Sequence, residues 1–258
     1  MKFEKIIFGK NPVLEALRCY PWKVEKIYIR YGSTGRHIDE ILMISRKHRI
    51  PLSFLDRKKF KSLENKIDTE NTQGIVSFLS IVEYFELDDL IARAFEHTNL
   101  PILLFLDKIQ DPQNFGAIAR SAECAGANGL IVTTKDTAPI NSTVVKSSSG
   151  AILHLPITKV YKPFEAVEKL KQSGFWLVGT YPNAEMNIWN TNFNVPITIV
   201  IGNEGKGISR AILKSCDVLV KIPMYGKTDS LNASVSAGVI LYEVRRQRDL
   251  LVRALPQQ

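Results

Sequence analysis

The stretch IPMYGKTDSLNASVSAGVILYE, residues 222–243, decides how this chain can fold. It begins as the end of a strand, passes through a polar loop that carries Ser230, and enters a helix that we expect to start near Asn232. Small side chains crowd the first turns of that helix, namely Ala233, Ser234, Ser236, Ala237 and Gly238. Slim side chains of this kind are found where two helices pack closely, because they let other backbone come near.

Upstream of this stretch, strands rich in Val, Ile and Leu alternate with helices from Pro101 onward. We expect strands in the segments ILLFLDKI (from 102), GLIVTT (129), AILHLPITKV (151), FWLVGTY (175), ITIVIG (197) and VLVKIPM (218). This alternation is typical of an α/β fold with a mainly parallel sheet covered on both faces. Ligands of such sheets bind in the loops beyond the carboxyl ends of the strands, where three loops of this chain are unusual.

Residues 1–82 form a smaller α/β pattern that carries nearly all of the excess positive charge. They contain 16 Lys and Arg against 9 Asp and Glu, whereas residues 83–258 contain 18 against 17. A basic unit joined to a nearly neutral one suggests that the basic unit binds a polyanion. The alternative is a solvated basic surface without a partner. Residues 83–100 are locally acidic and are expected to be a linker to the second domain, residues 101–258.

The first unusual loop lies in DKIQDPQNFGAIARSAECAG, residues 107–126. Asn114 suits the N-cap of a helix over residues 115–124, and Arg120 projects from the second turn of that helix. A cap and a solvated arginine would explain both residues without any function. The helix also carries small residues that let other backbone approach it: Gly116, Ala117, Ala119 and Ala122.

The second unusual loop is IVIGNEGKGIS, residues 199–209. Its glycines suit a loop folded around a small molecule, or simply a tight turn, and their G-x-x-G-x-G order is the reverse of the dinucleotide-binding fingerprint. The third loop, in the opening stretch, contains GKT at residues 226–228, but a phosphate-binding P-loop would need glycine where this chain has Lys221. The two commonest nucleotide-binding motifs are therefore not matched.

In their order and spacing, the segments NFGAIAR, IGNEG and IPMYGKTDSLNASVSAGVILYE resemble the motifs of the SpoU (TrmH-like) family of RNA ribose 2′-O-methyltransferases, which belongs to the SPOUT class. The resemblance covers residues 101–247. In the N-terminal part, IFGKNPVLEAL and TQGIVSFL are similar to parts of a substrate-binding domain, itself similar to a ribosomal protein, that accompanies many members. The architecture looks most like the branch that methylates a guanosine of the large-subunit (23S) ribosomal RNA.

The resemblance implies a site that binds S-adenosyl-L-methionine and activates a ribose hydroxyl. Its catalytic residues would be Asn114, Arg120, Glu204, Ser230 and Asn232. Its cofactor-binding residues would be Thr180, Gly202, Ile222 and Leu231. The backbone after the sixth strand of the domain would be threaded through an earlier loop as a trefoil knot, and the final helix would pair two chains as a homodimer.

The function implied is transfer of a methyl group from S-adenosyl-L-methionine to a ribose 2′-hydroxyl in structured RNA, with ribosomal RNA expected and transfer RNA as the alternative. A non-enzymatic RNA-binding protein on the same fold would lose the polar motif residues, which are all present. A small-molecule enzyme of the doubly wound class would carry a nucleotide-binding motif of the kinds that fail to match. Two positions depart from the family pattern: Gln113 stands where His is common, beside Asn114, and Ala233 stands where Val is frequent.

Metal sites, disulfides and membrane spans are not expected. The four histidines and three cysteines have the spacing of neither a metal site nor a disulfide framework. The strongest apolar run, PILLFL at residues 101–106, is far shorter than the roughly 18 residues that span a bilayer. Since MKFEKIIFGKNP at the start lacks the apolar core of a secretory signal, a cytoplasmic protein is expected.

Overall fold

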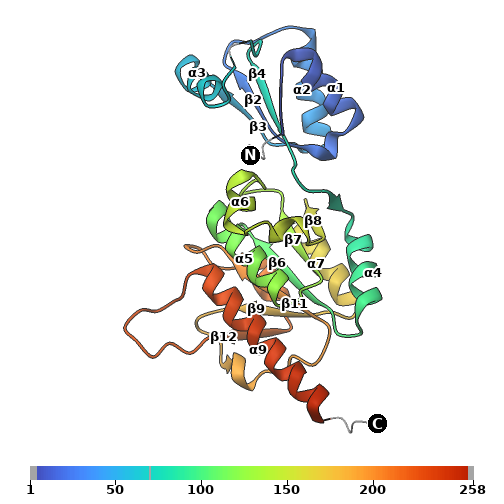
Figure 1. Ribbon diagram of the computed structural model, residues 1–258, viewed down its shortest axis with the longest axis vertical. Helices are drawn as coiled ribbons and strands as arrows, with labels where there is room; N and C mark the ends of the chain where they lie inside the picture. The colour runs from blue at the N-terminus through green and yellow to red at the C-terminus, as the bar shows by residue number, and fades with distance from the viewer. Residues whose placement is uncertain (1–4, 70, 255–258) are drawn as a thin grey trace. The chain divides into compact units, whose positions relative to one another are not determined.

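The computed structural model describes residues 5–69 and 71–254, and it divides into two compact units. The N-terminal unit extends to Glu83 and includes the short segment Pro139–Ser142. The C-terminal unit contains the rest of the chain. Figure 1 shows that each unit is built from one sheet and the helices that cover it.

The N-terminal unit contains a four-stranded sheet in the order β1-β4-β2-β3. Its strands are β1 (Lys5–Phe8), β2 (Val24–Arg30), β3 (Leu52–Leu55) and β4 (Ile75–Leu79). Its helices are α1 (Lys10–Cys19), α2 (Arg36–Lys47) and α3 (Arg57–Lys66). The core forms between one face of the sheet and the apolar sides of α1 and α2, and it includes Leu14, Ile27 and Ile41. Helix α3 lies on the other side of the sheet (Figure 1).

The C-terminal unit contains an eight-stranded sheet in the order β10-β12-β9-β11-β6-β7-β8-β5. Every pairing described in this sheet is parallel, as the alternation of strands and helices predicts. All residues of β6 and β7 are buried because helices cover both faces. The strands are β5 (Tyr84–Phe85), β6 (Ile102–Asp107), β7 (Gly129–Thr133), β8 (Ile157–Val160), β9 (Trp176–Thr180), β10 (Met186–Asn187), β11 (Ile197–Gly202) and β12 (Val218–Lys221).

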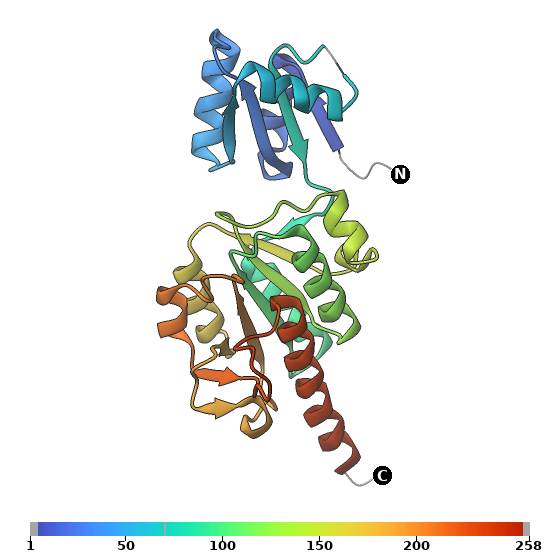
Figure 2. The same cartoon turned by 90° about the vertical axis from the view of Figure 1, so that its left-hand side faces the viewer.

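The helices of the C-terminal unit form two layers. Helices α4 (Leu87–His97), α7 (Pro163–Gln172) and α8 (Arg210–Ser215) pack their apolar sides into one core cluster with the central strands. Helices α5 (Pro112–Cys124) and α9 (Ala233–Ala254) lie side by side on the other face (Figure 2), and α6 (Ser142–Ser147) follows β7. Within the described ranges, no helix is both long and apolar enough to cross a membrane.

Two predictions about local structure need correction. The expected linker 83–100 instead supplies β5 and α4 to the C-terminal unit, where Leu90 and Ala94 of α4 are fully buried in the core. The strand expected over residues 151–160 is shorter, because residues 151–153 form a 3-10 turn and β8 begins only at Ile157. The turn forms because Gly150 is in a left-handed conformation that redirects the chain.

The small residues on α5 and α9 serve close packing between helices. A Cβ atom on Gly116 would lie 2.7 Å from the backbone oxygen of Val144 in α6, which confirms that backbone approaches α5 there. A Cβ atom on Gly238 of α9 would lie 3.6 Å from Ser121 Oγ of α5. That distance is ordinary van der Waals contact, so α9 packs against α5 at this position without requiring a glycine.

Arg248 connects α9 to the segments that directly precede β6 and β11. Arg248 is 7% exposed, and its guanidinium donates to the backbone oxygens of Leu100, Phe193 and Val195. Burial, together with the charge of Arg245, lowers the pKa of Arg248 to about 10, so the group stays protonated at neutral pH.

Replacing Arg248 by Met is expected to lower the free energy of unfolding by roughly 2 kcal/mol, because three carbonyls lose their donors while the desolvation cost of the charge is recovered. Urea denaturation of the full chain measures this change. Arg210→Met, at an exposed position on α8, is the matched control and should shift the free energy by less than about 0.5 kcal/mol. Equal stability of Arg248→Met and the native protein would contradict this account.

Candidate active site

Three loops that follow β6, β11 and β12 meet through one chain of hydrogen bonds. Asn232 Nδ2 donates to Asn114 Oδ1 at 3.0 Å, and Asn114 Nδ2 donates to Glu204 Oε1 at 2.7 Å. Asn114 lies in α5, Glu204 in the loop after β11, and Asn232 directly before α9. The fold therefore brings one polar residue from each of the three sequence motifs into contact.

Helices α5 and α9 both begin beside this network, and one of them begins at a different residue from the one predicted. Helix α9 begins at Ala233, and Asn232 Oδ1 accepts from the backbone N–H of Ser234 at 2.8 Å, so the predicted start near Asn232 is confirmed. Helix α5 begins earlier than expected, and its N-cap is Asp111, which accepts from the N–H of Gln113 at 2.9 Å. The prediction of Asn114 as N-cap is wrong. Pro112 at the first helical position favours the earlier start, which leaves the Asn114 carboxamide free for the network.

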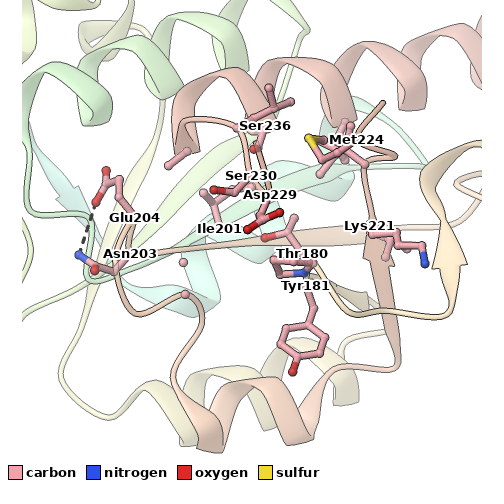
Figure 3. A pocket seen from close by; sticks show the side chains of 18 residues that line it. Thr180, Tyr181, Ile201, Asn203, Glu204, Lys221, Met224, Asp229, Ser230 and Ser236 are labelled. Carbon is pink, nitrogen blue, oxygen red and sulfur yellow. Dashed lines mark hydrogen bonds between the residues drawn. The ribbon is translucent and has the colours of Figure 1, made fainter. Parts of the chain in front are cut away.

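A cavity lies beside the network, at the carboxyl ends of β9, β11 and β12 (Figure 3). This is the edge at which parallel α/β sheets bind ligands. Glu204 and Ser230 line it. All four residues that the sequence comparison assigned to cofactor binding line it as well: Thr180, Gly202, Ile222 and Leu231.

The loop after β11 is held in shape by Asn203. Its Nδ2 donates to the backbone oxygen of Lys108 at 3.1 Å. Its Oδ1 accepts from the backbone N–H groups of Gly205 at 3.0 Å and Lys206 at 3.1 Å. Its own backbone exchanges two hydrogen bonds with Gly207, at 3.1 and 2.8 Å. These bonds fix the loop conformation without any ligand contact.

Gly202 stands where this loop folds back on itself. A Cβ atom there would lie 2.3 Å from both the carbonyl carbon of Gly207 and the nitrogen of Ile208, so no other residue fits without moving backbone. The far end of the loop is tied down by Asp107, a buried residue whose Oδ2 accepts from the N–H of Ser209 at 2.6 Å. The wall of the cavity is therefore rigid on this side.

Arg120 lies apart from the network. It is six residues beyond Asn114, which places it about 9 Å further along the axis of α5. Its side chain is exposed, and within residues 5–69 and 71–254 it makes no hydrogen bond or ion pair. Neither Arg120 nor Asn114 nor Asn232 is among the described residues that line the cavity. The donors of Arg120 are thus available to an external ligand.

Several cavity residues were not predicted from the sequence. Asp229, Lys221 and Ser236 line the cavity together with Asn203 (Figure 3). Asp229 directly precedes the predicted Ser230, and that adjacency was the one signal that could have identified it. Two carboxylates, those of Glu204 and Asp229, therefore border the cavity.

The lining suits S-adenosyl-L-methionine. Apolar side chains such as Ile201, Met224 and Leu231 offer surface to an adenosine ring system. Glu204 and Asp229 offer carboxylates to a ligand that carries an ammonium and a sulfonium charge. Gly202 lets the loop after β11 fold back closely on itself, which shapes this wall of the cavity.

Two family models match the chain in the places that the two units occupy. The model described as the SpoU rRNA Methylase family matches residues 101–242. The model described as RNA 2'-O ribose methyltransferase substrate binding matches residues 6–85. Together they extend from the N-terminal sheet to the middle of α9.

Three known proteins are similar to this chain, two of them over nearly its whole length. YacO of Bacillus subtilis (strain 168), of the TrmH family of tRNA/rRNA methyltransferases, is 37% identical over 94% of this chain and 96% of its own. The crystal structure of the SpoU methyltransferase AviRb from Streptomyces viridochromogenes is 28% identical with a TM-score of 0.61, covering 96% of this chain and 90% of its own, and AviRb has also been crystallised with AdoMet. The A. aeolicus TrmH/SpoU tRNA modifying enzyme is 31% identical with a TM-score of 0.55, covering 64% of this chain and 86% of its own. The fold, the motif loops and these matches agree, and the chain belongs to the SpoU rRNA Methylase family.

Proposed function

We propose that this protein transfers a methyl group from S-adenosyl-L-methionine to a ribose 2′-hydroxyl of structured RNA. The observation that carries the proposal is the hydrogen-bonded chain from Asn232 through Asn114 to Glu204, which joins the three motif loops at the edge of the cavity. The description of the N-terminal family model and the AdoMet complex of AviRb support the same reaction.

The cofactor would be held by the four predicted residues Thr180, Gly202, Ile222 and Leu231, all of which line the cavity. When bound, S-adenosyl-L-methionine supplies an electrophilic methyl group on a sulfonium. Thr180 is itself held in place, because its hydroxyl donates to the backbone oxygen of Val200 at 3.1 Å. A wall fixed in this way orients the ligand with little loss of entropy on binding.

The chain's polar residues would prepare the hydroxyl that receives the methyl group. A ribose hydroxyl is a poor nucleophile at neutral pH, so its oxygen must be positioned and its developing negative charge stabilised. Arg120 supplies an uncommitted guanidinium for the phosphate beside the target ribose and for that charge. It is not a simple base, because a guanidinium does not release its proton in proteins. Ser230 and the Asn114–Glu204 pair would orient the ribose from the cavity side.

Ribosomal RNA, and within it a guanosine of the large subunit, is the proposed substrate. The tRNA modifying enzyme of A. aeolicus covers only 64% of this chain, whereas a separate N-terminal unit matches the substrate-binding model in residues 6–85. The charge of that unit favours a polyanionic partner. Transfer RNA remains the competing substrate.

A homodimer and a trefoil knot belong to the same proposal. Helix α9 exposes apolar side chains that suit pairing with a second copy: Val235, Tyr242, Leu250 and Leu251. The knot is proposed from the motif resemblance, and it would join the loop that contains Gly202 and Glu204 to the segment with Ser230 and Ser236, which line one cavity.

Isothermal titration and modification mapping test the function. We expect the purified chain to bind S-adenosyl-L-methionine, and we expect one ribosomal 2′-O-methyl position to vanish from cells without the gene. Loss of a 2′-O-methyl group from transfer RNA instead would show that transfer RNA is the substrate. Unchanged methylation of both RNAs, or no binding of the sulfonium cofactor, would refute the proposal.

A further inference from the structure

The N-terminal unit contains a second cavity, on the face of its sheet that carries α3. Tyr28 of β2 and Phe78 of β4 line it and meet edge to face, with ring centroids 5.9 Å apart and planes at 83°. Lys26, directly opposite Phe78 in the strand register, places its amine 4.8 Å from the centroid of the Tyr28 ring. The cavity has a volume of about 200 Å³ and is closed in part by Leu63 of α3 and by residues 139–141. Two aromatic rings and a cation thus surround a space of ring size.

These aromatic side chains do not belong to the core of the unit. Ile27 and Ile29 alternate with Tyr28 along β2 and are fully buried against α1 and α2. Tyr28 and Phe78 point to the opposite face and stay half-buried. Apolar cavities with a few polar groups are the usual form of a ligand site, so this face has the character of a binding surface.

Positive charges lie on α3, and a carboxylate lies in the wall of the cavity. Helix α3 exposes five cations, Arg57, Lys58, Lys59, Lys61 and Lys66. Inside the cavity wall lies Glu25, whose side chain is almost completely buried. A carboxylate repels phosphate and accepts hydrogen bonds from N–H groups, which every nucleobase carries on its pairing edge.

We propose that this cavity seats one unpaired base of an RNA ligand, with the adjoining phosphates along α3. Bases that are free of pairing are recognised by stacking on aromatic side chains and by hydrogen bonds to their edges. The net positive charge of residues 1–82 favours this occupant over an apolar peptide. The inference deepens the proposed function and rests on it only for the choice of RNA as ligand.

Phe78→Leu in the full-length protein tests the base site, because it keeps the apolar bulk and removes the ring. Fluorescence anisotropy with labelled oligouridylate and oligoadenylate of about ten nucleotides should show roughly tenfold weaker binding, the size of one lost stacking contact. Affinity for a duplex RNA of the same length should stay within about twofold, since paired bases cannot enter the cavity. Tyr28→Leu should act in the same direction.

Trp22→Leu is the matched control, because Trp22 is 58% exposed on the same unit and does not line the cavity. Photocrosslinking of the native protein with an oligonucleotide that contains 4-thiouridine gives a readout that needs no variant. Crosslinks should fall on the peptides with Tyr28 and Phe78, and crosslinks confined to other segments would overturn the site.

The two proposals can fail separately. If the protein methylates RNA but Phe78→Leu changes neither single-strand affinity nor the KM for RNA, the base site is refuted and the enzyme function stands. If Phe78→Leu weakens single-strand binding while no methyl transfer to RNA is detected, the enzyme function is refuted and the base site stands. Equal weakening for duplex and single strands would indicate that the substitution disturbs the RNA-binding surface in general rather than one base contact, and would also overturn the base site.

Discussion

Gly202→Ala is expected to weaken binding of S-adenosyl-L-methionine by about 5- to 150-fold, the equivalent of the 1–3 kcal/mol that overpacking costs. The added methyl group would lie 2.3 Å from backbone atoms of Gly207 and Ile208, where no side chain can rotate aside. The loop must therefore shift, and it is the loop that forms one wall of the cavity. Isothermal titration of the purified variant measures the effect directly.

Gly205→Ala, three residues further along the same loop, is the matched control. Its added methyl group would have Asn203 Oδ1 as nearest neighbour, at 3.7 Å, which is ordinary contact. We expect cofactor affinity within about twofold of the native protein, since substitutions without a clash are usually nearly neutral. Equal losses of cofactor affinity for both variants would show that the loop responds to any added side chain. An unchanged affinity of Gly202→Ala would contradict the requirement for glycine at this position.

Arg120→Lys is expected to lower kcat by about 10²- to 10³-fold, the usual loss when one preorganised donor to a developing oxyanion is removed. Lysine keeps the charge but lacks the planar fork that binds a phosphate through two parallel hydrogen bonds. Affinity for S-adenosyl-L-methionine should not change, because Arg120 does not line the cavity. Single-turnover methylation of a native RNA substrate separates the chemical step from cofactor binding.

Arg93→Lys is the control for a loss of guanidinium elsewhere on the C-terminal unit. Arg93 lies on α4, with its guanidinium carbon 4.5 Å from the centroid of the Phe85 ring. Its replacement should leave kcat within about twofold. Near-normal turnover of Arg120→Lys would show that a point charge suffices at this position. It would refute the role proposed for the planar guanidinium of Arg120.

The sequence predicted the parts of the fold that depend on short-range patterns. Runs of Val, Ile and Leu that alternate with helices predicted a parallel sheet, and the pairings of β6, β7, β9 and β11 confirm it. The start of α9 near Asn232 was predicted from its polar loop and small residues, and it is confirmed. The patterns are local because strand alternation and helix caps depend on neighbours a few residues apart.

Predictions failed where two local signals competed or where burial decided. Asn114 is a good cap residue, but Asp111 followed by Pro112 starts α5 three residues earlier. The acidic segment 83–100 reads as a linker because its exposed side is charged, yet Leu90 and Ala94 are buried by strands that lie far along the chain. Which side of a helix is buried cannot be decided from its sequence before the segments that pack against it are known.

The sequence by itself determined the alternation of the main strands and helices of the C-terminal unit, the three motif loops and the basic character of the N-terminal unit. Only the tertiary structure decided that Asn232, Asn114 and Glu204 touch, that Asp229 borders the cavity, and that Tyr28 and Phe78 face one space. The first hydrogen bond of that chain joins residues 118 positions apart. The physical reason is that strand order in a sheet is set by burial between distant segments, so the residues at strand ends become neighbours only when the whole sheet has formed.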